Sequence, residues 1–151
     1  MRIILLLIVI LSLAFGYNVA RADEDDPTPE DIEIWKTLAE KGDAEAQFDL
    51  AEAYLKGDGG LRRDEQEASE WYYKSAMQGF VDAQFAMGFV YRGGNGHPMD
   101  KVLSYMWFDL AAKNGDIRAV ELRNDVAWSM TDVEIEEGRK KSREWKPEVV
   151  K

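Results

Sequence analysis

The chain has 151 residues, no cysteine, and 29 acidic against 19 basic side chains, which gives a formal net charge of −10. This charge excludes nucleic acid and anionic lipid as expected partners, because both bind proteins mainly through Lys and Arg. The lack of cysteine excludes disulfides, a thiolate nucleophile and a lipid-acceptor Cys. A protein partner with a basic or neutral surface is therefore favoured.

The N-terminal segment has the pattern of an export signal. A positively charged start precedes an apolar run over residues 3–15, and Ala20-Arg21-Ala22 is a small-residue cleavage site. The alternative is a membrane anchor, but a spanning helix needs roughly 20 apolar residues and Gly16 and Asn18 interrupt the run. Residues 1–22 are therefore predicted to be a signal peptide, with no membrane insertion after cleavage.

Removal of the signal peptide leaves 17 basic and 29 acidic side chains, a net charge of −12. The mature chain opens with the acidic run Asp23 to Asp26, so residues 23–27 are expected to be a disordered, solvated lead. Thr28 and Pro29 then have the types preferred at the N-cap and first turn of a helix. We expect a capping helix over 28–41, ended by Gly42.

Two sets of residues recur at a fixed spacing. The first returns 37 residues later and the second 36 residues later. A period in the thirties with glycines at the joints indicates stacked helix pairs, each of which needs a neighbour to bury its apolar face. The recurring pairs are Gly42/Gly79, Ala46/Ala83, Gln47/Gln84, Phe48/Phe85, Tyr54/Tyr91 and Gly57/Gly94, followed by Asp64/Asp100, Trp71/Trp107, Ala76/Ala112 and Gly79/Gly115.

The rest of the chain completes an all-α pattern. Repeat one is expected over 43–79 and repeat two over 80–115, each with two helices, and Trp71 and Trp107 are expected in equivalent buried positions. Two C-terminal helices follow over 116–145, the last opened by a capping box at Thr131 to Glu134. These make about seven helices without a strand, and residues 146–151 are expected to be a frayed tail.

The repeat pattern resembles a known family, the Sel1-like repeats, which are relatives of the tetratricopeptide repeat. The resemblance rests on two copies of one motif, and it implies an α-α superhelix, a right-handed solenoid over residues 28–145. Family members usually act as adaptors that hold proteins together, many of them in bacterial export compartments. The motif copies are Ala46-Gln47-Phe48-x-Leu50-x-x-x-Tyr54-x-x-Gly57 and Ala83-Gln84-Phe85-x-Met87-Gly88-x-x-Tyr91-x-x-Gly94, each followed by Asp64 or Asp100 and Trp71 or Trp107.

The sequence departs from the family pattern at three positions. Ala51 replaces the glycine that is kept at Gly88, and His97 and Ser104 stand where apolar and alanine residues are more usual. Exported relatives often carry a cysteine pair in each repeat, and this chain has none. Members of that disulfide-rich branch bind β-lactam-like molecules, and this activity is therefore not expected of the present chain.

Catalysis is not expected. His97 is the only histidine and lies in a Gly/Asn/Pro loop, where the usual state is solvated, and the sequence has no G-x-S-x-G motif. The acidic clusters lie on predicted helix surfaces, and Asp58 lacks the spacing of a calcium loop. No cofactor or metal is therefore expected.

The first helix of each pair usually lines the concave side of such a stack, so its polar positions are the predicted protein-binding site. Phe89 stands at the repeat position of Glu52 and is flanked by acids, as in an interface anchor with a polar rim. The alternative is that Phe89 packs against Leu122 or Val126 of the next helix. The predicted site residues are Glu45, Asp49, Glu52, Asp82, Phe89 and Asp125.

Two functions remain open at this point. The first is a non-catalytic adaptor or regulator in the periplasm or secreted fraction of a bacterium. The second is an envelope inhibitor or immunity protein that blocks a secreted toxin enzyme. The sequence does not identify the partner.

The cleavage site gives a direct test. We expect the mature protein to begin at Asp23, because Ala20-Arg21-Ala22 places the cut after Ala22. Mass spectrometry of the native protein measures this. A full-length N-terminus in purified membranes would instead make residues 3–20 an anchor.

Overall fold

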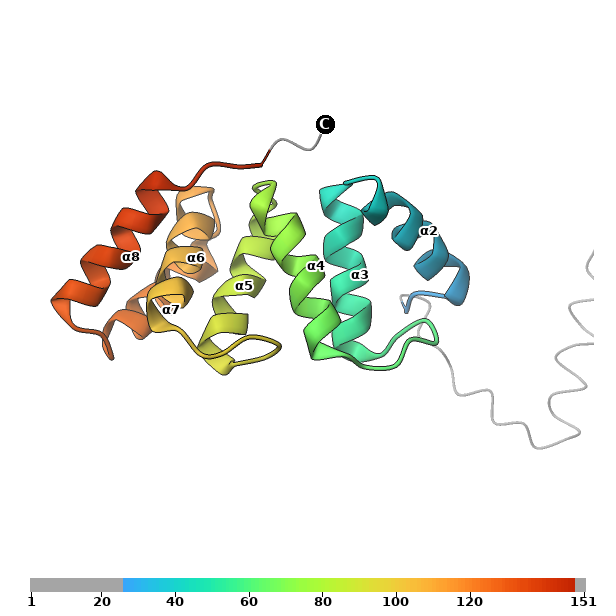
Figure 1. Cartoon of the computed structure of the whole chain (residues 1–151), viewed down its shortest axis with the longest axis horizontal. Helices are drawn as coiled ribbons and strands as arrows, with labels where there is room; N and C mark the ends of the chain where they lie inside the picture. The colour runs from blue at the N-terminus through green and yellow to red at the C-terminus, as the bar shows by residue number, and fades with distance from the viewer. Residues whose placement is uncertain (1–25, 149–151) are drawn as a thin grey trace, which may run out of the picture.

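The computed structural model describes residues 26–148; the predicted signal peptide and most of the acidic lead lie outside them. Within this range the chain forms seven α-helices and no strand (Figure 1). The helices are α2 (Pro29–Glu40), α3 (Ala44–Lys56), α4 (Glu65–Met77), α5 (Val81–Gly93), α6 (Lys101–Lys113), α7 (Ile117–Ala127) and α8 (Asp132–Glu144).

The helix ends follow from short polar signals in the sequence. Thr28 and Asp31 form a capping box at the start of α2, and Thr131 and Glu134 form a second one at α8. Asp64 accepts hydrogen bonds from two backbone N–H groups of α4. Positive φ angles at the glycines that follow α2 to α6 reverse the chain, whereas α7 and α8 end at Trp128 and Trp145 without a glycine.

The helices stack in chain order into a solenoid. α3 packs against α4 and α5 against α6, while α4 and α6 each pack against the first helix of the next pair. Figure 1 shows α2 at one end of the stack and α8 at the other. The prediction of an all-α solenoid with seven helices is confirmed.

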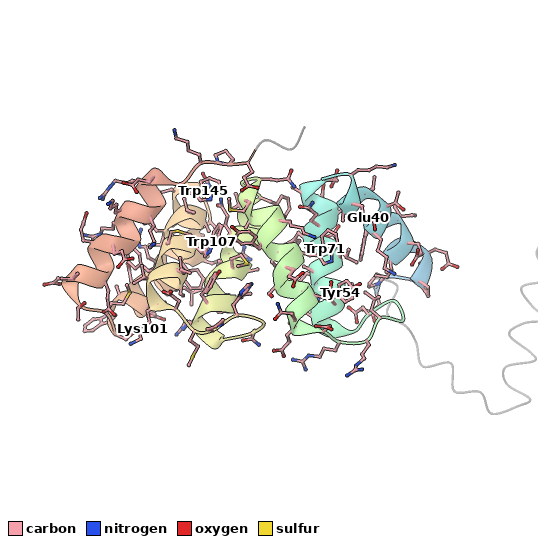
Figure 2. All side chains as sticks on the ribbon, viewed as in Figure 1. Glu40, Tyr54, Trp71, Lys101, Trp107 and Trp145 are labelled. Atoms are coloured by element: carbon pink, nitrogen blue, oxygen red, sulfur yellow. The ribbon has the colours of Figure 1, made fainter. Side chains whose placement is uncertain are left out.

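The centre of the core lies between α4 and α6. Trp107 on α6 is only 2% exposed and lies beside Trp145 (Figure 2), whose ring it meets edge-on. The Tyr73 ring also meets Trp107 edge-on. Trp71, at the repeat position of Trp107, is only partly buried, and the Lys74 ammonium lies 3.7 Å from its ring centroid. The expectation of two equivalent buried tryptophans is therefore wrong: the Trp145 ring covers Trp107, whereas Trp71 is covered by a lysine side chain.

Gly88 allows the closest approach between the helices of the second pair. A Cβ atom at this position would lie 2.4 Å from the ring of Phe108, which is fully buried. The buried Ser104 hydroxyl donates a 2.8 Å hydrogen bond to the Gly88 carbonyl. This bond explains why a serine stands where alanine is more usual.

The last helix is held by a buried carboxylate. Asp109 on α6 accepts hydrogen bonds from Lys113 at 2.7 Å, Arg123 at 3.0 Å and Ser142 of α8 at 2.7 Å. Burial by itself would raise the pKa of Asp109, but these donors together lower it. Asp109 therefore joins α6, α7 and α8 as an ionised group.

The segment after α8 is ordered as far as Glu148. The Glu148 backbone N–H donates a 2.8 Å hydrogen bond to the Met77 carbonyl at the end of α4. The frayed tail expected over 146–151 is therefore corrected for residues 146–148, which cross back to the middle of the stack.

Among the helices that the structure describes, none has the length and apolar character needed to cross a membrane.

The contrast between the two tryptophans is testable. Trp107→Ala should lower the free energy of unfolding by about 3 to 5 kcal/mol, because it leaves a cavity in the core. That is a large share of a typical stability of ~5 to 15 kcal/mol. Trp71→Ala should cost less, since its ring is partly exposed, and urea denaturation of both variants measures the difference. Equal midpoints for the two variants would contradict this assignment.

Candidate functional site

A groove of about 680 Å³ lies along the first helix of each pair. We call it the α3–α5 groove, since these two helices and α4 supply most of its walls, with contributions from α2 and α7. Its lining residues include Trp35, Phe48, Asp49, Glu52, Lys56, Glu65, Ser69, Tyr72, Asp82, Phe85, Phe89, Asn95 and Arg118. It therefore mixes aromatic rings with charged groups.

The second repeat supplies the apolar wall of the groove. Phe89 is 43% exposed, and its ring meets Phe85 and Phe108 edge-on, with centroids 5.2 and 5.3 Å apart. These contacts hold the ring in one orientation while leaving nearly half of it open. Phe89 is therefore partly exposed in the groove and packs on Phe85 and Phe108, rather than on Leu122 or Val126 of α7 as in the alternative.

The first repeat places polar groups at the same positions. Glu52 and Tyr72 stand where the second repeat has Phe89 and Phe108, and the Tyr72 hydroxyl donates a short hydrogen bond to the Glu52 carboxylate. Burial, followed by this bond, raises the pKa of Tyr72 far above its ordinary value. Lys56 also pairs with Glu52 at 3.0 Å. A polar contact in one repeat thus replaces a ring contact in the other.

Asp82 is neutralised from α7. Arg118 pairs with Asp82 at 2.7 Å and with Asp116 at 2.7 Å, and its guanidinium lies 4.4 Å from the Phe85 ring centroid. The two carboxylates raise the pKa of Arg118 above its ordinary value. Asp82 therefore already has a cation, and Arg118 closes one end of the groove.

Asp49 differs from Glu52 and Asp82, the groove carboxylates described above, in its lack of a partner among the described residues. Within residues 26–148 it has no hydrogen-bond or ion-pair partner, although it is half-buried. Burial raises its pKa, and Glu45, Asp43 and Glu52 add to the rise. Ionisation of Asp49 is thus less favourable than that of an ordinary Asp, and a cation brought by a ligand would stabilise the ionised form.

Four of the six predicted site residues line the groove: Asp49, Glu52, Asp82 and Phe89. Glu45 and Asp125 are exposed but lie outside the lining. Sequence reasoning missed Trp35 and Tyr72 as lining residues because both match the core pattern of the second helix. Only the hydroxyl of Tyr72 distinguishes it from the Phe108 of the next repeat.

His97 lies away from the groove. It is half-buried rather than solvated, because its ring stacks on Tyr91 with centroids 5.3 Å apart and its Nε2 atom is enclosed. Within the described part of the chain, no three His, Asp or Glu side chains are placed to hold a metal ion.

Known proteins share both the sequence pattern and the fold. The Sel1 repeat family model matches residues 44–80 and 81–116. The crystal structure of c5321, a protective antigen of uropathogenic Escherichia coli with an SLR fold, is 34% identical and gives a TM-score of 0.73 over 76% of this chain and 24% of that one. A Sel1 repeat protein from Oxalobacter formigenes is 35% identical, with a TM-score of 0.57 over 58% of this chain and 36% of that one.

Curated relatives are much longer proteins. Chitin synthase regulator SKT5 of Saccharomyces cerevisiae is 31% identical over 109 residues, which is 72% of this chain and 16% of the relative. HRD3A of Arabidopsis thaliana, an ERAD-associated E3 ubiquitin-protein ligase component, is 34% identical over 77 residues, 51% of this chain and 11% of the relative. The chain thus spans less than a fifth of these relatives.

Two matched repeats, seven stacked helices and solved neighbours with the same fold agree with one another. The chain belongs to the Sel1-repeat family.

Proposed function

We propose that this protein is a non-catalytic interaction module that holds a segment of a protein partner in the α3–α5 groove. The proposal rests on one observation: the same groove contains a half-buried Asp49 without an ion-pair partner among the described residues and the half-exposed ring of Phe89. A buried anchor beside a charge is the usual chemistry of an interface centre. Relatives named as regulators and as a ligase component support an interaction role.

The groove sets the chemistry of the partner. Asp49 favours a Lys or Arg side chain, and the Phe85 and Phe89 rings favour an apolar one. The Glu52 and Asp82 carboxylates already have cations in Lys56 and Arg118, so they add less to recognition. The partner is therefore a segment that carries one basic and one apolar side chain close together.

Export is the proposed setting. The signal pattern over residues 1–22 and the similarity to two bacterial Sel1-type structures support a periplasmic or secreted protein of a bacterium. An adaptor or regulator is the favoured role, and an inhibitor of a secreted toxin enzyme is the alternative. The gene next to this one separates the two, since an inhibitor is expected beside its toxin.

A pull-down from the envelope fraction, with the purified protein as bait, tests the proposal and identifies the partner. The eluted protein is then titrated calorimetrically against the bait. A partner whose affinity is unaffected by every groove variant would contradict the groove assignment.

The first prediction concerns the anchor. Phe89→Ala should weaken the complex by about 2 kcal/mol, roughly a 30-fold rise in Kd, mostly through faster dissociation. Asp49→Lys should instead slow association, and added salt should have the same effect on the parent by screening. Surface plasmon resonance separates the two rates.

The chain offers a matched control for the charge change. Glu144→Lys makes the same reversal on α8, where the side chain is exposed and outside the groove, so it should leave the association rate nearly unchanged. Glu70→Lys, on the exposed side of α4, is a second control. If these controls weaken binding while Asp49→Lys and Phe89→Ala do not, the partner binds elsewhere.

The second prediction concerns pH. Because the pKa of Asp49 is raised in the free protein, this carboxyl takes up its proton at a higher pH than an ordinary Asp. A basic ligand group needs the ionised form, so affinity should fall as pH drops through the raised pKa. Asp49→Asn should bind more weakly at neutral pH and lose this dependence, as calorimetry from neutral pH down to the ordinary Asp pKa of 3.8 measures. An identical pH profile in both proteins would contradict the role of Asp49.

A further inference from the structure

The two ends of the described stack are each half of a helix pair. The repeat spacing gives α7 the same register as α3 and α5, the first helices of their pairs: Ile117 follows Ala44 and Val81, and Val120 follows Gln47 and Gln84. In the same register α2 is a second helix, like α4. Leu38 stands 37 residues before Ser75, and Trp35 stands 37 residues before Tyr72.

In both complete pairs, the second helix covers the face of the first helix that carries these positions, Ala44 and Gln47 on α3 and Gln84 on α5. The Ser75 hydroxyl donates a 2.6 Å hydrogen bond to the Ala44 carbonyl. The Gln78 amide donates a 2.8 Å bond to the side chain of Gln47, and Asn114 donates a 2.8 Å bond to Gln84 in the next pair. Ser75, Gln47 and Gln84 are all buried as a result.

No described helix covers the equivalent face of α7. Ile117 is 83% exposed, Trp128 is 91% exposed, and Val120 is exposed between them. Their spacing of three and eleven residues from Ile117 puts them on one side of the helix. α8, the next helix in the chain, packs mainly against α6 instead, where Gly138 lies against the Tyr105 ring.

α2 shows the complementary deficiency. One face of α2 packs against the next first helix, as in α4, because Ile32 and Ala39 are buried against α3. Leu38, however, is 39% exposed, whereas the equivalent Ser75 is fully buried by its own first helix. Ile34 lies beside Leu38 and is also exposed. The face that meets a first helix in repeat one thus meets none in α2.

We propose that two copies of this chain associate head to tail, with α7 of one copy and α2 of the next forming the helix pair that the described residues leave incomplete at each end of the stack. Leu38 would then cover Ile117 as Ser75 covers Ala44, and Lys41 would lie opposite Val120 as Gln78 lies opposite Gln47. The new contact continues an interface that the chain already makes twice within itself. Contiguous exposed apolar residues at both ends are what such a contact would bury.

The geometry makes the contact heterologous. The two surfaces are different, so every associated pair leaves one free α2 face and one free α7 face. Association should therefore continue with rising concentration rather than stop at a dimer. A symmetric dimer through two α7 faces would stop at two copies, which distinguishes the alternatives.

Two variants each disable one end. Leu38→Glu places a charge on the α2 face, and Val120→Lys places a second cation opposite Lys41. Each alone should be a monomer by sedimentation equilibrium and by light scattering, while the parent should increase in apparent mass at concentrations up to about 1 mM. A mixture of the two variants should form a one-to-one dimer and nothing larger, because one intact α7 face and one intact α2 face remain.

Two control variants distinguish non-specific association of exposed apolar side chains from the proposed contact. Val133→Lys and Met99→Glu also remove exposed apolar side chains but lie outside both faces, so they should associate like the parent. Circular dichroism should show parental helicity for every variant, since all the substituted side chains are exposed. A parent that stays monomeric throughout, a Leu38→Glu variant that still dimerises, or a mixture that remains monomeric would each overturn the proposal.

Discussion

The contact between the two helices of a pair is the constraint on which the rest of the structure depends. A first helix presents a small residue, Ala51 or Gly88, and an aromatic ring of the second helix, Tyr72 or Phe108, lies over it. Neither helix could remain helical in isolation, because most of its stabilisation comes from this packing. The same ring contacts the next residue of the first helix, Glu52 or Phe89, which lines the groove in both repeats.

The two repeats build different halves of the α3–α5 groove, the proposed binding surface, from the same backbone. In repeat one the edge position is a carboxylate held by a tyrosine hydroxyl, and in repeat two it is a ring held by two other rings. The scaffold is therefore indifferent to the polarity of this position, provided that the second helix offers a matching group. The side chain at this groove position can therefore vary without disturbing the core, so the residues that fold the protein differ from those that face the groove.

Much of the fold could be predicted from the sequence because its signals are local. Capping residues and glycines set the helix ends, and the fixed period set their stacking. The features that the sequence predicted wrongly depend on contacts between helices that are distant in the chain. Trp71 and Trp107 look alike in sequence, and only the return of Trp145 from the last helix buries one of them. For the groove, position on the first helix placed Asp49 and Phe89 among the lining residues, and the i,i+4 spacing of Glu52 and Lys56 allows their ion pair. The ion pair between Asp82 and Arg118 of α7 could be assigned only from three-dimensional distances.

The backbone bond from Glu148 to Met77 changes how the stack can come apart. In a solenoid whose repeats touch only their nearest neighbours, unfolding begins at either end and moves inward one repeat at a time. Here the C-terminal segment passes over α5 and α6 and is joined to α4, so the last helix cannot detach without releasing a contact in the first repeat. The C-terminal segment of the described chain is thus linked back to α4. We therefore expect the C-terminal half to unfold as one cooperative unit.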